Sequence, residues 1–136
     1  MKIQLEKWKV IDLNLSHAGQ DSKDKNSFEL NVGNHFPKED DKNSFWIHFR
    51  LKVLEKSFEL SLKAVFEFKL LDHPITEEFK LSTFPKVNGP AIAFPYLRAF
   101  VSTLTLQAGL KPVILPSINF IKLAENDLTV SGEEEE

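Results

Sequence analysis

The chain has 136 residues, of which 42% are hydrophobic and 27% are charged, and its net charge is −3. This length predicts a single domain at residues 1–130, followed by an acidic, disordered tail at residues 131–136. The absence of cysteine excludes disulfides and thiolate metal sites, and no apolar run approaches the roughly 18 residues of a membrane span. Because the sequence shows neither a basic stripe nor the apolar core of a signal peptide, we expect a cytoplasmic protein without a nucleic-acid partner and without membrane insertion.

Apolar and polar side chains alternate along four segments, which predicts four β-strands. The alternation is clearest in residues 45–53 and 58–70, and it is shorter in residues 28–32. Residues 3–15 alternate as well, but Trp8 falls on the other parity from most of its apolar neighbours, which predicts a bulge or a change of face. Short connections favour antiparallel pairing, so we expect a sheet with one apolar and one polar face.

A different period begins after Gly89, and it predicts one long helix. Gly109 stands where a left-handed C-terminal cap would fall, and Pro90 suits the first turn. Pro95 is expected to kink or restart the helix. The alternation of residues 101–105 leaves a strand as the alternative there. The apolar positions that step by three and four residues are Phe94, Leu97, Val101, Leu104 and Ala108.

The fold class that follows is α+β, with a four-stranded antiparallel sheet followed by one long helix. Residues 71–89 contain two prolines and are expected to form a crossover with irregular or edge structure. Residues 120–130 are expected to hold one or two helical turns at most. One helix covers only part of so large an apolar sheet face, and Arg98 is the only charge in residues 89–110. We therefore expect the helix to pack on its own sheet and on a second subunit, with Arg98 paired to a carboxylate.

The stretch "AIAFPYLRAFVSTLTLQAGLKPVILPSINFIKL" resembles the protein-export chaperone family SecB. The similarity lies in Phe94-Pro95-Tyr96 with Arg98, in the glycine that ends the helix, and in a proline-containing segment that leads to Asn119-Phe120. It covers roughly 40 residues. The four preceding strands agree with the family in number and order.

The resemblance implies a homotetramer, built as a dimer of dimers, that holds unfolded polypeptide clients in apolar grooves. It also implies delivery to the SecA translocation motor, or binding of an antitoxin as some relatives do, and it implies no cofactor. The chain departs from the family pattern because few residues follow Phe120, so the second C-terminal helix and the arm that contacts SecA have no counterpart.

Seven apolar side chains are candidates for a peptide-binding groove or a subunit interface. The side chains on the helix could instead belong to the core within one subunit. The tryptophan, on the polar face of its strand, could instead be covered by neighbouring strands or by a second subunit. The seven residues are Phe94, Tyr96, Leu97, Phe100, Val101, Leu104 and Trp46.

Catalysis and metal binding find little support in the sequence. The four histidines are scattered without metal-ligand spacing, the glycines form no phosphate loop, and no nucleophile elbow occurs. We therefore expect no enzyme, no catalytic residue, no metal and no cofactor. The function that we expect is a SecB-like chaperone for non-native polypeptides in export or delivery. The alternatives are a dedicated adaptor for one partner, such as an antitoxin, and a small enzyme or ligand carrier.

Overall fold

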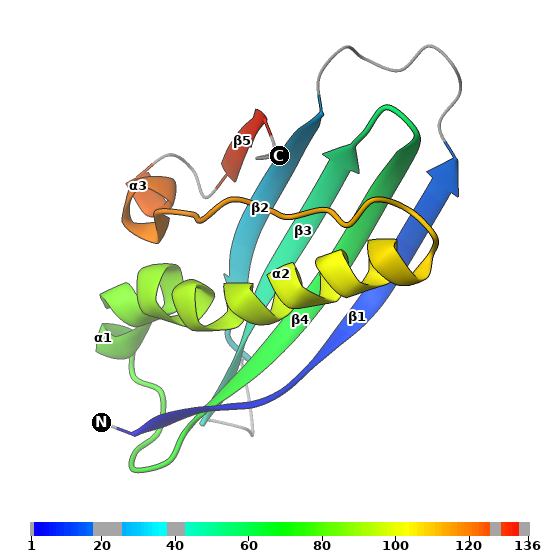
Figure 1. Ribbon diagram of the computed structural model, residues 1–136. Helices are drawn as coiled ribbons and strands as arrows, with labels where there is room; N and C mark the ends of the chain where they lie inside the picture. The colour runs from blue at the N-terminus through cyan, green and yellow to red at the C-terminus, as the bar shows by residue number, and fades with distance from the viewer. Residues whose placement is uncertain (1, 18–25, 38–42, 126–128, 134–136) are drawn as a thin grey trace.

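The computed structural model describes residues 2–17, 26–37, 43–125 and 129–133, and it shows one antiparallel sheet with a helical layer on one face (Figure 1). The strand order in the sheet is β1-β4-β3-β2-β5. Within the described part of the chain no helix is long and apolar enough to cross a membrane. The strands are β1 (Ile3–His17), β2 (Ser27–His35), β3 (Ser44–Leu54), β4 (Phe58–Leu70) and β5 (Thr129–Glu133).

The four strands expected from alternation are confirmed, and the structure adds a fifth. β5 pairs antiparallel with β2, where we expected no strand. The one or two helical turns expected in residues 120–130 are confirmed by α3 (Phe120–Glu125). The expected disordered tail was wrong for residues 131–133, because the edge of β2 offers backbone hydrogen bonds that local sequence does not reveal. Residues 134–136 of the expected tail lie outside the described residues.

β1 carries two irregularities in its pairing with β4, between Leu5 and Lys7 and between Val10 and Asp12. Each inserts one residue into β1 and reverses the face of the side chains that follow. The first irregularity places Trp8 on the inner face of the sheet, where it stacks on Phe66. The predicted bulge is thereby confirmed.

The helical layer consists of α1 (Glu77–Lys80), η1 (Phe84–Asn88), α2 (Gly89–Gln107) and α3 (Phe120–Glu125). α2 crosses the inner face of the sheet, and residues 110–119 run back beside it (Figure 1). The segment between β4 and α2, which we expected to be irregular, contains α1 and the π-helix η1. Thr76 caps the N-terminus of α1, because its Oγ1 accepts a hydrogen bond from Phe79 N at 3.0 Å.

α2 is a continuous helix of 19 residues, so the strand alternative for residues 101–105 was wrong. Pro95 lies within α2 on the exposed side of the helix. Because proline has no N–H group, the carbonyl four residues earlier has no helical hydrogen-bond partner, and on this side it can bond to water. Gly109 has a φ of 85°, and Leu110 N donates to Thr105 O at 2.9 Å. The left-handed Gly109 and the hydrogen bond from Leu110 back to Thr105 form a Schellman motif, and the left-handed glycine cap expected at the helix end is thereby confirmed.

The core lies between the inner face of the sheet and the helical layer. Its rings come from alternate positions of β3 and β4, and Phe84 and Phe94 contact them from the helical layer. The outer face of the sheet carries mostly exposed polar and charged side chains, as the alternation predicts. The largest fully buried aromatic side chains are Phe45, Phe49, Phe58, Phe66 and Phe68.

Candidate functional site

The side of α2 that faces away from the sheet is exposed and carries no charge. Tyr96 is 50% exposed, Leu106 is 56% exposed and Ile92 is 46% exposed. These positions recur every three or four residues and therefore form one stripe along the helix. We call the stripe the α2 surface; its residues are Ile92, Tyr96, Ala99, Thr103 and Leu106.

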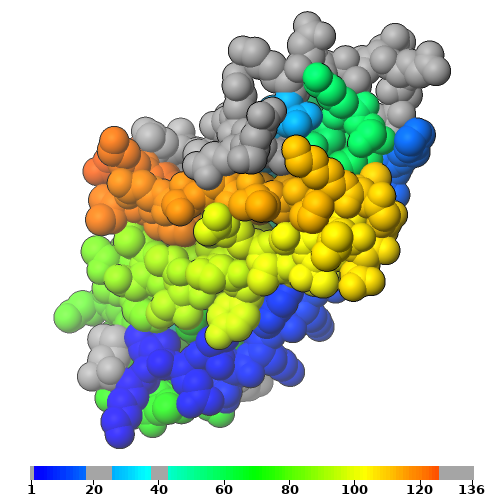
Figure 2. Space-filling model, viewed as in Figure 1, coloured from blue at the N-terminus to red at the C-terminus, as the bar shows by residue number. Residues whose placement is uncertain are grey.

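Residues 110–119, which we call the strap, extend the α2 surface along one side. Figure 2 shows the two segments as neighbouring bands across one face of the molecule, α2 in yellow-green and the strap in orange. Val113 and Leu115 point into the core, whereas Ile114 between them is 52% exposed. The strap thus presents an apolar side chain beside an already apolar helix face.

Two polar side chains of α2 hold the strap in place. Arg98 Nε donates a hydrogen bond to Leu115 O at 2.6 Å, and Thr105 Oγ1 accepts one from Val113 N at 2.9 Å. Thr105 is fully buried and its hydroxyl donates to Val101 O at 2.9 Å. Because the strap forms no helix or strand, these bonds satisfy groups that secondary structure leaves unpaired.

Arg98 was expected to pair with a carboxylate, and the structure corrects this expectation. Its hydrogen-bond partner is the main-chain carbonyl of Leu115 in the strap, within the same chain. A buried main-chain carbonyl that the strap cannot pair internally needs a hydrogen-bond donor from elsewhere in the chain. The lone charge of α2 therefore positions the strap.

The other edge of the α2 surface approaches β1. Phe100 is half-buried and meets the ring of Trp8 edge-on, with 5.9 Å between ring centroids. Leu104 is also half-buried and packs against the core. Trp8 is thus covered by α2 within one subunit.

The seven candidate residues fall into three groups in the structure. Phe94, Leu97 and Val101 belong to the subunit core, with exposures of 4%, 0% and 0%, so the intrachain alternative holds for them. Tyr96 lies on the α2 surface, with Phe100 and Leu104 along its border. Trp46 is half-buried on the outer face of the sheet, so the structure does not bring it together with the others.

Three residues of this region, Thr105, Leu106 and Ile114, were not among the candidates from the sequence. Thr105 entered the sequence analysis only through the strand alternative for residues 101–105. It lies four residues after Val101, which lies four residues after Leu97, and all three side chains are buried on the same side of α2. Ala108, which the three-and-four stepping placed on that face, is exposed at the helix end. Helical spacing from Tyr96 would have identified Leu106, whereas Ile114 depends on the path of the strap.

Titratable groups are unusual at two places, both away from the α2 surface. Partial burial lowers the pKa of His48 from its ordinary value of 6.5, and the nearby charge of His35 lowers it further. A hydrogen bond from Lys2 N to Asp72 Oδ2, at 3.1 Å, lowers the pKa of that carboxyl group. Within the described residues no cluster of three or more histidine, cysteine or acidic side chains is suited to hold a metal ion.

Comparison with known proteins places these features in a family. The family model described as preprotein translocase subunit SecB matches residues 6–130. An uncharacterized protein of Methanocaldococcus jannaschii is 44% identical over 57 residues, which are 42% of this chain and 37% of that protein. The chain therefore matches well under half of the length of this curated relative.

Two solved structures share the fold at low sequence identity. A SecB-like chaperone of Mycobacterium tuberculosis, solved in complex with a ChAD peptide from the HigA1 antitoxin, has a TM-score of 0.63 at 17% identity. That match covers 85% of this chain and 87% of the other. A Streptococcus agalactiae protein of unknown function has a TM-score of 0.58 at 15% identity, and the match covers 86% of this chain and 98% of the other. Since the family model spans nearly the whole described fold, the chain belongs to the SecB family.

Proposed function

We propose that this chain is a chaperone that holds non-native polypeptides on the α2 surface, without turnover chemistry. The observation that carries the proposal is the exposed, uncharged stripe from Ile92 to Leu106, bordered by Ile114 of the strap. A charge-free helix face in water marks a surface that buries against something else. Membership of the SecB family supports a polypeptide client as the occupant.

The physical basis of client binding is non-directional apolar burial. Burying apolar area yields about 25 cal/mol per Å² whatever the client sequence, so one surface serves many clients. β1 adds a second source of affinity, because in the described sheet it pairs only with β4 and leaves its other edge open. An extended client could extend the sheet there through main-chain hydrogen bonds.

The α2 surface also supports a homo-oligomer, for which we propose a tetramer built as a dimer of dimers. A second copy offers the same uncharged helix face, and two-fold symmetry would bring the two faces together. Tyr96 would lie at such an interface, with Phe100 and Leu104 at its border. Oligomerisation and client binding would then compete for part of the same surface.

We propose protein export or delivery from the cytoplasm as the setting, with SecA as the receiver in export. The second candidate is a dedicated adaptor for one partner, such as an antitoxin. It is favoured by the fold match to a SecB-like chaperone that holds an antitoxin peptide. A panel of unrelated denatured clients separates the two, since a dedicated adaptor would protect its own partner and none of the panel.

Light scattering during dilution of a denatured client tests the proposal directly. Wild-type protein should suppress aggregation at stoichiometric ratio, and the double variant Tyr96→Gln/Leu106→Gln should suppress it less at every ratio. Each half-exposed side chain is worth about 1 kcal/mol when fully buried, so the affinity should fall roughly tenfold or more. Leu71→Gln is the matched control, because Leu71 is equally exposed but lies at the end of β4.

Native mass spectrometry of the same samples reports the oligomer and the bound client together. We expect a multiple of the subunit mass in the absence of client and a complex with client in its presence. No suppression by a several-fold excess of wild-type protein would contradict the chaperone proposal. A monomeric mass at micromolar concentration would contradict the oligomer alone.

A further inference from the structure

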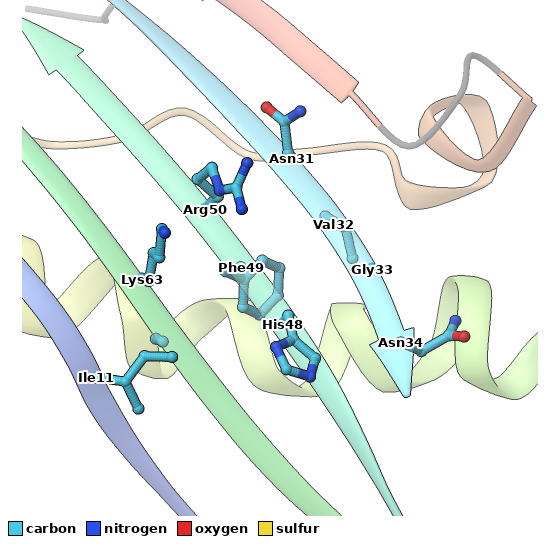
Figure 3. A pocket seen from close by; sticks show the side chains of 10 residues that line it. Ile11, Asn31, Val32, Gly33, Asn34, His48, Phe49, Arg50 and Lys63 are labelled. Atoms are coloured by element: carbon cyan, nitrogen blue, oxygen red, sulfur yellow. The ribbon is translucent and has the colours of Figure 1, made fainter. Parts of the chain in front are cut away.

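The outer face of the sheet, opposite to the α2 surface, carries a hollow over Gly33 of β2. A Cβ atom added at Gly33 would meet nothing within 4 Å, so the hollow exists because β2 has no side chain there. Its volume is about 340 Å³, enough for one or two side chains of another molecule. Figure 3 shows His48 and Arg50 of β3 and Lys63 of β4 projecting around this hollow.

The charges around the hollow are unfavourable for the stability of the sheet. Arg50 and Lys63 are direct cross-strand partners in the β3–β4 register, and both are exposed. Like charges directly opposite on neighbouring strands destabilise a sheet. Neither side chain takes part in an ion pair within the described part of the chain, and no acidic residue lines the hollow. Asp12 of β1 is the cross-strand partner of Lys63, but the two form no ion pair. Arg50 and Lys63 therefore keep hydrogen-bond donors that an external anion can occupy.

Acidic residues surround the positive pair at a short distance along the sheet. Asp12 of β1 is the cross-strand partner of Lys63. Glu29 of β2 lies two residues before Asn31, which is the partner of Arg50, and Glu67 lies four residues after Lys63 on β4. These carboxylates would repel any long polyanion that crossed the face, whether a phosphate backbone or a long run of acidic side chains. A polypeptide segment with one or two carboxylates, flanked by uncharged residues, fits between them.

We propose that the Gly33 hollow is a docking site for an acidic segment of a partner polypeptide. One carboxylate of the segment lies between Arg50 and Lys63, and the Arg50 guanidinium binds it through two parallel hydrogen bonds. The Asn31 amide, opposite Arg50 in the β2–β3 register, borders the hollow and offers a donor and an acceptor to the main chain of the segment. Because the hollow and the α2 surface lie on opposite sides of the sheet, the chain can hold a client and an acidic partner at the same time.

Fluorescence anisotropy with a labelled peptide that contains two consecutive glutamates between uncharged residues tests this proposal on the full chain. The glutamate peptide should bind saturably, and its glutamine counterpart should not bind. Arg50→Gln/Lys63→Gln should weaken binding about tenfold or more. Lys111→Gln/Lys122→Gln is the control with the same change in charge, since both lysines are exposed away from the outer face, and it should leave affinity nearly unchanged.

Gly33→Tyr separates the hollow from simple charge attraction. It fills the hollow and leaves Arg50 and Lys63 in place, and tyrosine favours a strand, so the fold should persist. We expect Gly33→Tyr to abolish peptide binding, and we expect a bound denatured client not to displace the peptide. Equal weakening by the two double variants, or unchanged binding by Gly33→Tyr, would overturn the proposal.

Two further outcomes would identify a different occupant of the Gly33 hollow and would overturn the proposal. Complete displacement of the peptide by inorganic phosphate at the same charge concentration would identify a small-anion site. A rise in the mass of the protein that Arg50→Gln/Lys63→Gln abolishes would identify a second copy, which would supply the glutamates of its own residues 133–136.

Discussion

Arg98 of α2 and Leu115 of the strap are joined by a hydrogen bond of 2.6 Å from a guanidinium nitrogen to a main-chain carbonyl. The bond links the only charged side chain of the long helix to the segment that returns beside it. Leu115 is fully buried, so its carbonyl lies where few other donors reach. The position of the strap, and with it Ile114 at the border of the α2 surface, depends on this bond.

Arg98→Ala should loosen the strap and destabilise the protein by about 1–3 kcal/mol, because a carbonyl loses a charged donor. Hydrogen exchange should quicken at the amides of Val113 and Ile114, while the amides of β3 keep their protection. Arg98→Lys retains a charged donor and should cost less. Equal exchange in Arg98→Ala and wild type would show that the bond does not hold the strap.

Thr105→Val should be destabilising although the two side chains have nearly the same shape. The substitution leaves Val113 N–H buried without an acceptor, which costs about 1–3 kcal/mol. Thr105→Ser keeps the hydroxyl group and removes only a methyl group, so it serves as the control. Urea denaturation measures both, and a Val variant as stable as the Ser variant would contradict the assignment.

The strand and helix pattern was largely predictable from the sequence because both periods are local. The alternation of residues 45–53 and 58–70 identified β3 and β4, and the spacing from Phe94 to Leu104 identified α2. β5 was not predictable, since it forms on the edge of β2, which lies roughly a hundred residues earlier in the chain. Pairing over such a separation leaves no periodic signal in a five-residue strand.

The α2 surface was only partly predictable, for a physical reason. A helix apolar on several sides does not reveal which side its own sheet covers. Phe94 and Tyr96 looked equivalent in sequence, but Phe94 packs on Phe49 of β3 and Tyr96 faces outward. The hydrogen-bond partner of Arg98 could not be predicted from the sequence either. The acceptor is a main-chain carbonyl, and because every residue has one, no residue type identifies it.

Gly89→Ala should destabilise the protein, which reverses the usual effect of this substitution in a helix. Alanine in place of glycine normally gains about 1 kcal/mol within a helix. At Gly89 the new Cβ would collide with Ile47 Cδ1 in the fully buried core, and overpacking there costs about 1–3 kcal/mol. Gly33→Ala is the control, since its Cβ meets open space, and it should be neutral or stabilising. Similar urea midpoints for the two variants would contradict the close approach.

The stability of the protein should fall as the pH falls below about 6.5 because of His48. Burial, and secondarily the charge of His35, lowers the pKa of His48, so the unfolded chain binds this proton more readily than the folded chain. The stabilising difference is complete above pH 6.5 and is lost between that value and the lower pKa of the folded state. His48→Gln should remove this contribution from urea midpoints measured in this range. A histidine NMR titration of His48 with a midpoint at or above 6.5 would contradict the shift.

Site-specific photo-crosslinking tests most directly whether clients bind to the α2 surface. A photoreactive phenylalanine replaces Tyr96, Leu106 or, on the outer face of the sheet and away from the Gly33 hollow, Glu59, and each variant is irradiated with a denatured client. We expect client crosslinks from positions 96 and 106 and none from position 59. Crosslinks from position 59 alone, or equally from all three positions, would contradict client binding on the α2 surface.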